Sequence, residues 1–220
     1  MRLCYQTVLF DFDGTICDTG EGIMDCVRLA LQEMGYPVPP TATLRRFVGP
    51  PAEQGYMTYC GMNREQALQA VQHFRCHYNV DGWKKTSIYP GIPELLRDLK
   101  QAGATVCVAS SKPQNMVERM LPCFHIQQYF DVVSAADNSD RHSDKDTVIR
   151  HALALSHAES GTSTVMVGDT HFDAVGADKV GLPFIGAAYG YGGPEDLHAD
   201  GRKVPLASSP DGLRQYLFHD

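Results

Sequence analysis

The sequence predicts an α/β protein, in which helices cover both faces of a parallel sheet and a small helical segment is inserted after the first strand. Short apolar, β-branched runs alternate with amphipathic helical patterns along most of the 220 residues. The runs contain too few polar residues for strands with one face in water, so we expect both faces to be buried. The stretch between the first two runs is far longer than a single crossover helix requires.

Five apolar runs predict the strands, at residues 7–10, 105–109, 132–133, 164–167 and 183–185. Apolar residues at helical spacing predict helices between them. Two such stripes are Ile92, Leu95, Leu96 and Leu99, and Val148, Ile149, Ala152 and Leu153. Since ligands of open α/β sheets bind beyond the carboxyl ends of the strands, polar residues at these ends are the candidate site residues.

The helical insert is expected over residues 16–85, which leaves residues 1–15 and 86–220 for the core. Asp18 and Glu21 predict a capping box at the start of its first helix. The proline-rich segment 35–40 ends that helix, because proline blocks helical continuation. Two apolar stripes mark its helices: Ile23, Cys26, Val27, Ala30, Leu31 and Met34, and then Ala67, Val71, Phe74 and Tyr78.

Composition narrows the functional classes. The formal net charge of −7 argues against non-specific binding to nucleic acid or to an anionic membrane. The seven cysteines are odd in number and form no CxxC pair, which argues against a disulfide framework or a structural zinc site. No apolar run approaches the ~20 residues that span a bilayer, and Asp11 interrupts any signal peptide. We therefore expect a cytoplasmic protein with no nucleic-acid or membrane partner.

Two carboxylates follow the first strand in the segment DFDG. Asp11 and Asp13 lie two residues apart, so in extended backbone both point to the same side. Gly14 then permits a tight turn whose amide groups can approach an anion. The alternative is that Asp-Gly is a simple turn at a solvated strand end.

A second pair follows the strand at 164–167. If a helix begins there, Asp169 and Asp173 stack on one helical face. Four carboxylates at adjacent strand ends would repel one another without a cation, and Mg²⁺ typically takes one or two of them together with phosphate oxygen. The alternative, that Asp169 only caps a helix, leaves the convergence unexplained.

Three further residues could bind phosphate. Ser110 ends the strand at 105–109 and offers a hydroxyl, although Ser-Ser-Lys-Pro is also ordinary turn chemistry. Lys145 precedes a helix and could neutralise phosphate charge, or could belong to a solvated charge cluster. Lys112 is either another cation of the site or a surface residue at a helix start.

Taken in order, DFDGT (residues 11–15), VASSK (108–112), Lys145 and GDTHFD (168–173) resemble the motifs of the haloacid dehalogenase-like hydrolase superfamily. The resemblance covers essentially the whole chain and is closest to the phosphoglycolate-phosphatase-like branch. It implies a Rossmann-like parallel sheet core and a helical cap domain of the first kind, formed by the insert.

The resemblance also implies a division of labour. Asp11 would attack phosphorus, and Asp13 would protonate the leaving alcohol and later deprotonate water. Mg²⁺ would be held by Asp11, the backbone carbonyl of Asp13 and Asp169, while Asp173 supports the metal or Lys145. Ser110 and Lys145 would bind the phosphoryl group. Such cooperation is required, because one general acid supplies only about 10²–10⁴ of a rate enhancement that reaches ~10²¹ for phosphate monoesters.

Alternatives within the family differ at single residues. Dehalogenases lack the second aspartate, phosphonate-cleaving relatives carry a lysine early in the cap, and β-phosphoglucomutases carry a histidine in the first cap helix. This chain has Asp13, no lysine in residues 16–35, and Ile23 at the histidine position. Hydrolysis is therefore favoured over a sugar phosphomutase and over a non-catalytic phosphate-binding protein.

The substrate is expected to be a small phosphorylated metabolite chosen by the cap. Phosphoglycolate, a nucleoside monophosphate as for a 5′-nucleotidase, a sugar phosphate and pyrophosphate all remain open. Our candidates for contacting the leaving group are Arg45, Arg46, Phe47 and Gly49. The alternative is that Phe47 packs inside the cap while the arginines face solvent. His171 is interpreted as a neighbour of the metal motif, and Cys17 could make activity sensitive to oxidation.

Overall fold

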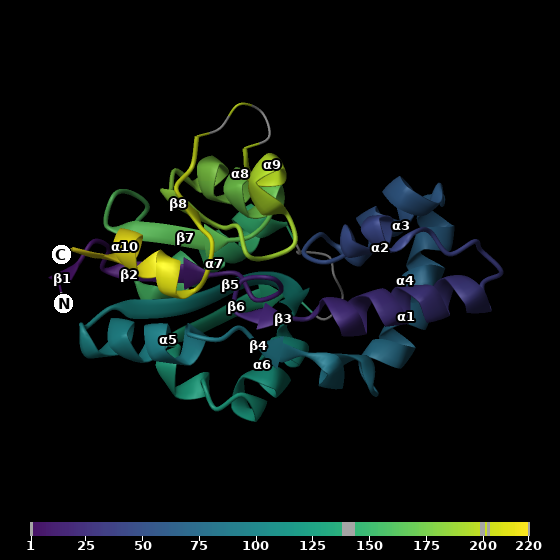
Figure 1. Cartoon of the computed structure of the whole chain (residues 1–220), viewed down its shortest axis with the longest axis horizontal. Coiled ribbons are helices and arrows are strands. Elements are labelled where there is room, and N and C mark those ends of the chain that lie inside the picture. Colours follow the sequence, from purple (N-terminus) through teal and green to yellow (C-terminus); the bar gives the residue numbers. More distant parts are fainter. Residues whose placement is uncertain (1, 138–143, 199–200, 202, 220) are drawn as a thin grey trace.

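The central feature of the computed structural model, which describes residues 2–137, 144–198, 201 and 203–219, is a six-stranded parallel sheet (Figure 1). Its strand order is β6-β5-β2-β7-β8-β9. The strands are β2 (Thr7–Phe10), β5 (Thr105–Pro113), β6 (Val132–Ala136), β7 (Thr164–Gly168), β8 (Phe184–Ala187) and β9 (Leu206–Ala207). All five predicted strands are present, and the two-residue β9 was not predicted. Because β2 lies between β5 and β7, the segments after these three strands are neighbours.

Helices cover both faces of this sheet, as predicted. In β2, Val8 and Phe10 belong to one apolar cluster and Leu9 to the other, as the period of two in a strand requires. The first cluster includes α5 (Ile92–Gln101) and α6 (Gln114–Cys123), and the second α7 (Lys145–Ser156) and α8 (His171–Val180). The four apolar residues predicted for α5 are fully buried, and each stabilises the fold by about 1.5–3 kcal/mol.

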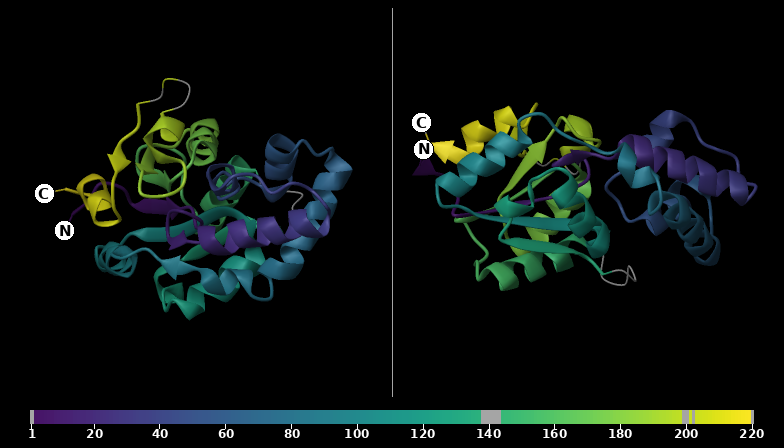
Figure 2. Two further views of the ribbon diagram at one scale, coloured as in Figure 1. Left: turned by 45° about the vertical axis from the view of Figure 1, so that its right-hand side comes forward. Right: turned by 90° about the horizontal axis from the view of Figure 1, so that it is seen from below.

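The helical insert is formed by α1 (Gly20–Glu33), α2 (Thr41–Arg45), α3 (Ala52–Cys60), α4 (Arg64–Tyr78) and the 3₁₀ helix η1 (Gly82–Lys85). It lies at one end of the long axis of the molecule, beside the sheet (Figures 1 and 2). Helix α1 packs on α4 and on η1. Two short antiparallel strands, β3 (Cys17–Asp18) and β4 (Ser87–Ile88), join the segments that enter and leave the insert.

The predicted capping box at the start of α1 is wrong. The N-cap is Thr19, which makes no side-chain capping bond. The Asp18 carboxylate instead accepts a hydrogen bond from the Gly20 amide (3.3 Å) and one from the Tyr191 hydroxyl. The Asp18 carboxylate, which the local sequence pattern assigned to capping, therefore binds a tyrosine from a distant part of the chain. The end of α1 is as predicted, with Gly35 in the left-handed region (φ 71°).

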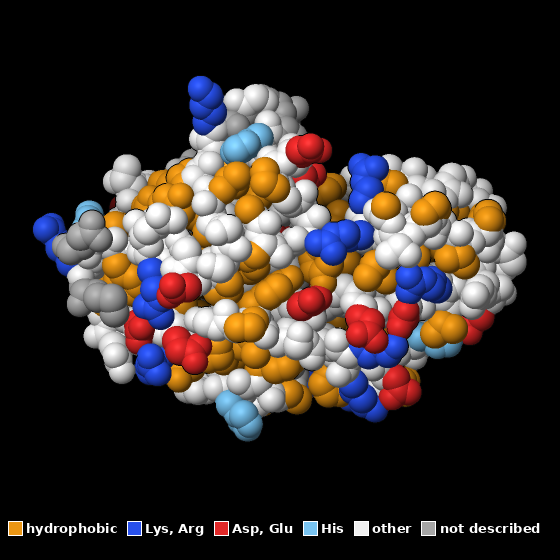
Figure 3. Space-filling model, in the orientation of Figure 1, with side chains coloured by type: hydrophobic (Ala, Val, Ile, Leu, Met, Phe, Trp, Pro, Cys, Tyr) orange, Lys and Arg blue, Asp and Glu red, His pale blue; other side chains and the backbone are white. Residues whose placement is uncertain are grey.

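The remaining elements close the fold around its termini. Strands β1 (Arg2–Leu3) and β10 (Phe218–His219) pair with each other beside α10 (Arg214–Leu217). Helix α9 (Gly193–Leu197) follows the loop after β8. Within the described ranges, no helix is both long and apolar enough to cross a bilayer. On the face shown in Figure 3, acidic and basic side chains are interspersed. All seven cysteines are free thiols.

Candidate active site

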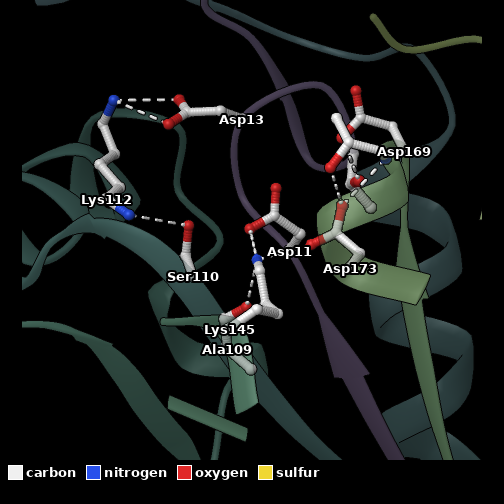
Figure 4. A network of polar contacts seen from close by, with 10 residues as sticks. Asp11, Asp13, Ala109, Ser110, Lys112, Lys145, Asp169 and Asp173 are labelled. Carbon is white, nitrogen blue, oxygen red and sulfur yellow. Dashed lines mark hydrogen bonds and ion pairs between the residues drawn. The ribbon is translucent and has the colours of Figure 1, made fainter. Parts of the chain in front are cut away.

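The predicted convergence of carboxylates is present at the carboxyl ends of β2 and β7 (Figure 4). Asp11 and Asp13 follow β2, and Asp169 and Asp173 follow β7. Among the described residues, every buried side chain of an acidic or basic residue belongs to this one cluster: Asp11, Asp13, Lys112, Lys145, Asp169 and Asp173. Burying a charge costs free energy unless it is paired, so a concentration of this kind marks a site and not a packing arrangement.

Lys145, the first residue of α7, is the cation at the centre of the cluster. Its Nζ donates to Asp11 Oδ1 (2.6 Å) and to the Ala109 carbonyl (3.1 Å), and it pairs with Asp173 Oδ1 (2.6 Å). Its exposed fraction is 7%, which rules out the alternative of a solvated charge cluster. Burial is the largest single effect and lowers the pKa of Lys145, but the ion pairs and hydrogen bonds with Asp11 and Asp173 together outweigh it and raise the pKa, so the side chain remains a cation.

Lys112 near the end of β5 is the second buried cation, and the surface alternative for it is wrong. Its Nζ donates to Asp13 Oδ1 (3.0 Å) and to the Tyr78 hydroxyl (2.8 Å). Its backbone amide donates to the Ser110 hydroxyl (3.3 Å), which places the predicted Ser110 at the same edge. Tyr78 is the last residue of α4 and was predicted only as part of an apolar stripe. No local pattern in the sequence connects its hydroxyl with Lys112, which lies 34 residues further along the chain.

Asp169 and Asp173 are brought together differently from the prediction. Helix α8 begins at His171 with Thr170 as its N-cap, so Asp169 lies before the helix and neither stacks on its face nor caps it. Asp173 closes a capping box, accepting from the Thr170 amide (3.0 Å) and hydroxyl (2.9 Å). Asp169 accepts from the Tyr191 amide (2.7 Å) and from the Thr15 hydroxyl (3.3 Å). Both carboxylates are thus held by a backbone amide and a threonine hydroxyl.

Glycine is required where the backbone passes over Asp169. Gly14 has φ 85°, and a Cβ there would lie 2.0 Å from Asp169 Oδ2. A Cβ on Gly190 would lie 2.4 Å from the same oxygen. The DFDG turn and the loop after β8 therefore enclose this carboxylate from two sides.

The residues present fit a divalent cation. Asp11, Asp169 and Asp173 each offer an oxygen, and these atoms lie within 4.8 Å of one another. With all six buried charges ionised, the cluster carries two negative charges in excess, which a dication would balance. Burial raises the pKa of Asp11 to about 7 against the opposing effect of Lys145, and burial raises that of Asp169 well above its ordinary value. Hard carboxylate oxygens are the ligands that Mg²⁺ prefers.

A cavity of about 240 Å³ opens beside Asp13 and Lys112 and is lined on its other side by the insert. Of the predicted leaving-group residues, Phe47 and Gly49 line it. Arg45 instead donates to the Gly190 carbonyl (3.0 Å) and lies over the Tyr191 ring (4.6 Å), while Arg46 lies over the Tyr59 ring (4.7 Å). Phe47 also packs edge-on against Tyr56 and Tyr59 inside the insert, as the alternative expected, and its contact with a leaving group stays a prediction.

Two further sequence predictions concern neighbours of the site. Cys17 is fully buried, and burial raises the pKa of its thiol well above the ordinary value, which opposes oxidation through a thiolate. His171 lies at the start of α8 and lines a second cavity of about 260 Å³ together with Lys145.

Comparison with known proteins identifies the family. The sequence pattern of the haloacid dehalogenase-like hydrolases matches residues 8–187. A 5′-nucleotidase of Pseudomonas aeruginosa is 35% identical over 98% of this chain and 96% of its own. The tyrosine-protein kinase PtkA of Mycobacterium tuberculosis is also 35% identical, over 96% of this chain and 72% of its own length.

Two other relatives bear on the predicted branch and fold. A phosphoglycolate phosphatase of Caulobacter vibrioides is 31% identical over 84% of this chain and 80% of its own, so the predicted resemblance to that branch is confirmed. The crystal structure of a predicted phosphatase from Clostridium acetobutylicum matches with a TM-score of 0.91 and 34% identity, covering 96% of this chain and 97% of its own. The chain belongs to the haloacid dehalogenase-like hydrolase family.

Proposed function

We propose that this protein is a Mg²⁺-dependent phosphatase that hydrolyses a small phosphomonoester through a phosphoryl intermediate on Asp11. Membership of a hydrolase family and relatives named as phosphatases support the reaction class. The observation that carries the mechanism is the placement of Asp11. One of its oxygens is held by Lys145, and it lies at the edge of the Asp169 and Asp173 cluster, two residues before Asp13.

The proposed metal site consists of Asp11 and Asp169, with the backbone carbonyl of Asp13 as a further ligand. A bound Mg²⁺ would neutralise the excess charge and polarise the phosphoryl oxygens. Asp173 supports this site through its ion pair with Lys145 (2.6 Å) and its hydrogen bonds to Thr170. Its fixed position keeps the Lys145 ammonium directed at Asp11.

In the first proposed step, a carboxylate oxygen of Asp11 attacks phosphorus while the bond from phosphorus to the leaving oxygen breaks. Asp13 gives its proton to that oxygen, so the product leaves as a neutral alcohol. Lys145 and Ser110 bind the phosphoryl oxygens as negative charge develops on them.

In the second step, Asp13 accepts a proton from a water molecule that attacks the same phosphorus. The bond to Asp11 breaks, which returns the Asp11 carboxylate and releases inorganic phosphate. Lys112, held between Asp13 and Tyr78, positions the Asp13 carboxyl for both proton transfers.

We further propose that residues 16–85 form a cap that excludes water from this chemistry. Two contacts support it, because Tyr78 of the insert bonds to Lys112 and Arg45 bonds to the loop after β8.

The seven free cysteines fit a reducing cytoplasm. The substrate class includes phosphoglycolate and nucleoside monophosphates, the two suggested by the names of relatives.

The test is phosphate release from a panel of phosphomonoesters with Mg²⁺ or with EDTA, using the wild type and Asp11→Asn. We expect release that needs Mg²⁺ and is lost in Asp11→Asn while that variant stays folded. A parallel incubation with ATP and a tyrosine peptide covers the activity named for the PtkA relative. Peptide phosphorylation without release from any ester would contradict the hydrolase proposal.

A further inference from the structure

The cavity beside Asp13 extends from the acid residue into the insert. Asp13 and Lys112 line the cavity from the core side, so we expect a leaving group whose oxygen is protonated by Asp13 to occupy it. Its insert side is lined mainly by apolar groups, contributed by α1, α4 and the segment between α2 and α3. Ligand pockets of this kind combine apolar and aromatic walls with a few polar groups that fix orientation.

Part of the cavity lining is an aromatic strip, formed by Phe74 and Tyr78, that is linked to Asp13 through Lys112. Phe74 and Tyr78, one helical turn apart on α4, stack with ring centroids 5.2 Å apart and an interplanar angle of 14°. The Tyr78 hydroxyl accepts a hydrogen bond from Lys112 (2.8 Å), whose ammonium also binds Asp13. Tyr78 is buried and Phe74 is only partly buried, so Phe74 has ring surface available to a ligand.

A second part of the cavity lining is also aromatic. Phe47 lines the cavity and is held by edge-on contacts with Tyr56 and Tyr59 at 5.2 and 5.4 Å. Met116, a side chain that adapts well to flat ligands, lines the cavity from α6 of the core. A planar group entering the cavity therefore meets aromatic or thioether surface contributed by three separate elements.

The charges around the cavity offer little attraction to an anionic leaving group. With Asp13 ionised, Asp13 and Glu53 balance Lys112 and Arg75; with Asp13 protonated for the first step, the lining has a single positive charge in excess. The Lys112 ammonium is already bound to Asp13. Glycolate would bring a carboxylate next to apolar walls and would leave most of the aromatic strip uncovered. Arg75 is the lining cation that such a carboxylate would have to use.

We propose that this cavity binds a planar, uncharged ring as the leaving group of the substrate, with Phe74 as its stacking surface and Phe47 as a second aromatic contact. The inference rests on the proposed phosphatase function and selects within it. It assigns the substrate class as nucleoside monophosphates or aryl phosphates, in preference to phosphoglycolate.

The experiment measures kcat/KM with Mg²⁺ for AMP, UMP, phenyl phosphate, phosphoglycolate and glycerol 3-phosphate, in the wild type and in Phe74 variants. We expect each ring ester to exceed phosphoglycolate by about tenfold or more. In Phe74→Leu the ratio of ring ester to glycerol 3-phosphate should fall by about tenfold, since stacking of a base on an aromatic side chain is worth that much. Phe74→Tyr keeps a ring and should restore the ratio.

Leu68→Ala is the matched control, because Leu68 lies on the same helix with 43% of its surface exposed and outside the cavity lining. Ratios between esters cancel any general loss of folding or of Asp13 positioning. A higher kcat/KM for phenyl phosphate than for the nucleotides would identify aryl phosphates as the substrate class.

Two results would overturn the inference while leaving the phosphatase proposal standing. One is a preference for phosphoglycolate over every ring ester that is lost in Arg75→Met. The other is an unchanged ratio of ring ester to glycerol 3-phosphate in Phe74→Leu. Failure to hydrolyse any ester would instead contradict the proposed function itself.

Discussion

At the scale of single residues, the active-site cluster depends on charges that can be buried only together. Lys145 contacts two carboxylates and Lys112 contacts a third, while Asp169 is held by backbone and hydroxyl donors. Removing one partner of a buried pair leaves an uncompensated charge, which costs more than the pair contributes. Single substitutions here should therefore affect both stability and chemistry.

Lys145→Met removes the cation that Asp11 and Asp173 share. We expect kcat to fall by about 10²–10³, as for loss of one preorganised donor, and the metal-free protein to lose about 3–5 kcal/mol of stability. Phosphate release and urea denaturation measure the two effects. Lys179→Met, an exposed lysine on α8 paired with Asp146, is the control and should change neither. Near wild-type turnover by Lys145→Met would contradict the role given to it.

The raised pKa of Asp11 predicts how pH affects the protein without metal. Burial raises this pKa from 3.8 to about 7, so folding favours the protonated carboxyl. The resulting stability is fully present below pH 3.8 and is lost as the pH rises through about 7. Mg²⁺ binds the ionised form and should therefore raise Tm more at pH 8 than at pH 5.

Differential scanning fluorimetry with EDTA or Mg²⁺ between pH 4 and pH 8 measures this effect. Asp11→Asn should flatten the difference between the two conditions, which separates Asp11 from other titrating groups. An equal Mg²⁺ shift at pH 5 and pH 8 in the wild type would contradict metal binding at Asp11.

At the scale of elements, hydrogen bonds and a cation–π contact connect the insert to the loop after β8. Arg45 at the end of α2 bonds to the Gly190 carbonyl and lies over Tyr191. The Tyr191 amide in turn donates to Asp169, and its hydroxyl bonds to Asp18 at the start of the insert. The position of the insert is thereby connected to a proposed metal ligand.

Arg45→Met tests this connection. We expect kcat/KM to fall by about fivefold, which corresponds to about 1 kcal/mol from the lost contacts, and by the same factor for every ester. Arg46→Met is the matched control, since Arg46 contacts only Tyr59 within the insert among its described interactions. A loss confined to one ester would show that Arg45 contacts the leaving group, as the sequence first suggested.

At the scale of the whole molecule, the reactivity of each cysteine thiol measures how well the packed core excludes solvent. Cys76 and Cys123 are exposed, whereas Cys17, Cys26 and Cys107 are buried. Burial raises the pKa of Cys26 to about 11 and that of Cys107 to about 12, so few thiolates form there at neutral pH.

Iodoacetamide at pH 8 should therefore modify Cys76 and Cys123 first, and the three buried cysteines only as the protein unfolds. Peptide mass spectrometry over time measures each site, and labelling in urea provides the reference for full reactivity. Modification of Cys107 as fast as Cys123 in native protein would contradict the packing of the sheet against α7.

The sequence was sufficient to predict five of the six strands of the sheet, because they are continuous apolar runs; the two-residue β9 is too short to form such a run. It also predicted that Asp11, Asp13, Ser110, Lys145, Asp169 and Asp173 would lie at one edge, where the structure places them. Individual hydrogen bonds between distant segments were not predictable. Local patterns contain no information about Tyr191 bonding to Asp18, Tyr78 bonding to Lys112, or Arg45 reaching Gly190.

In the proposed mechanism, Asp11 becomes phosphorylated during turnover. The most direct test is to quench the protein with acid during hydrolysis of a reactive phosphomonoester with Mg²⁺, reduce any acyl phosphate with borohydride, and map the modified residue by peptide mass spectrometry. We expect conversion of Asp11 to homoserine that requires both substrate and Mg²⁺. Turnover with an unmodified Asp11, or modification at another carboxylate, would contradict it.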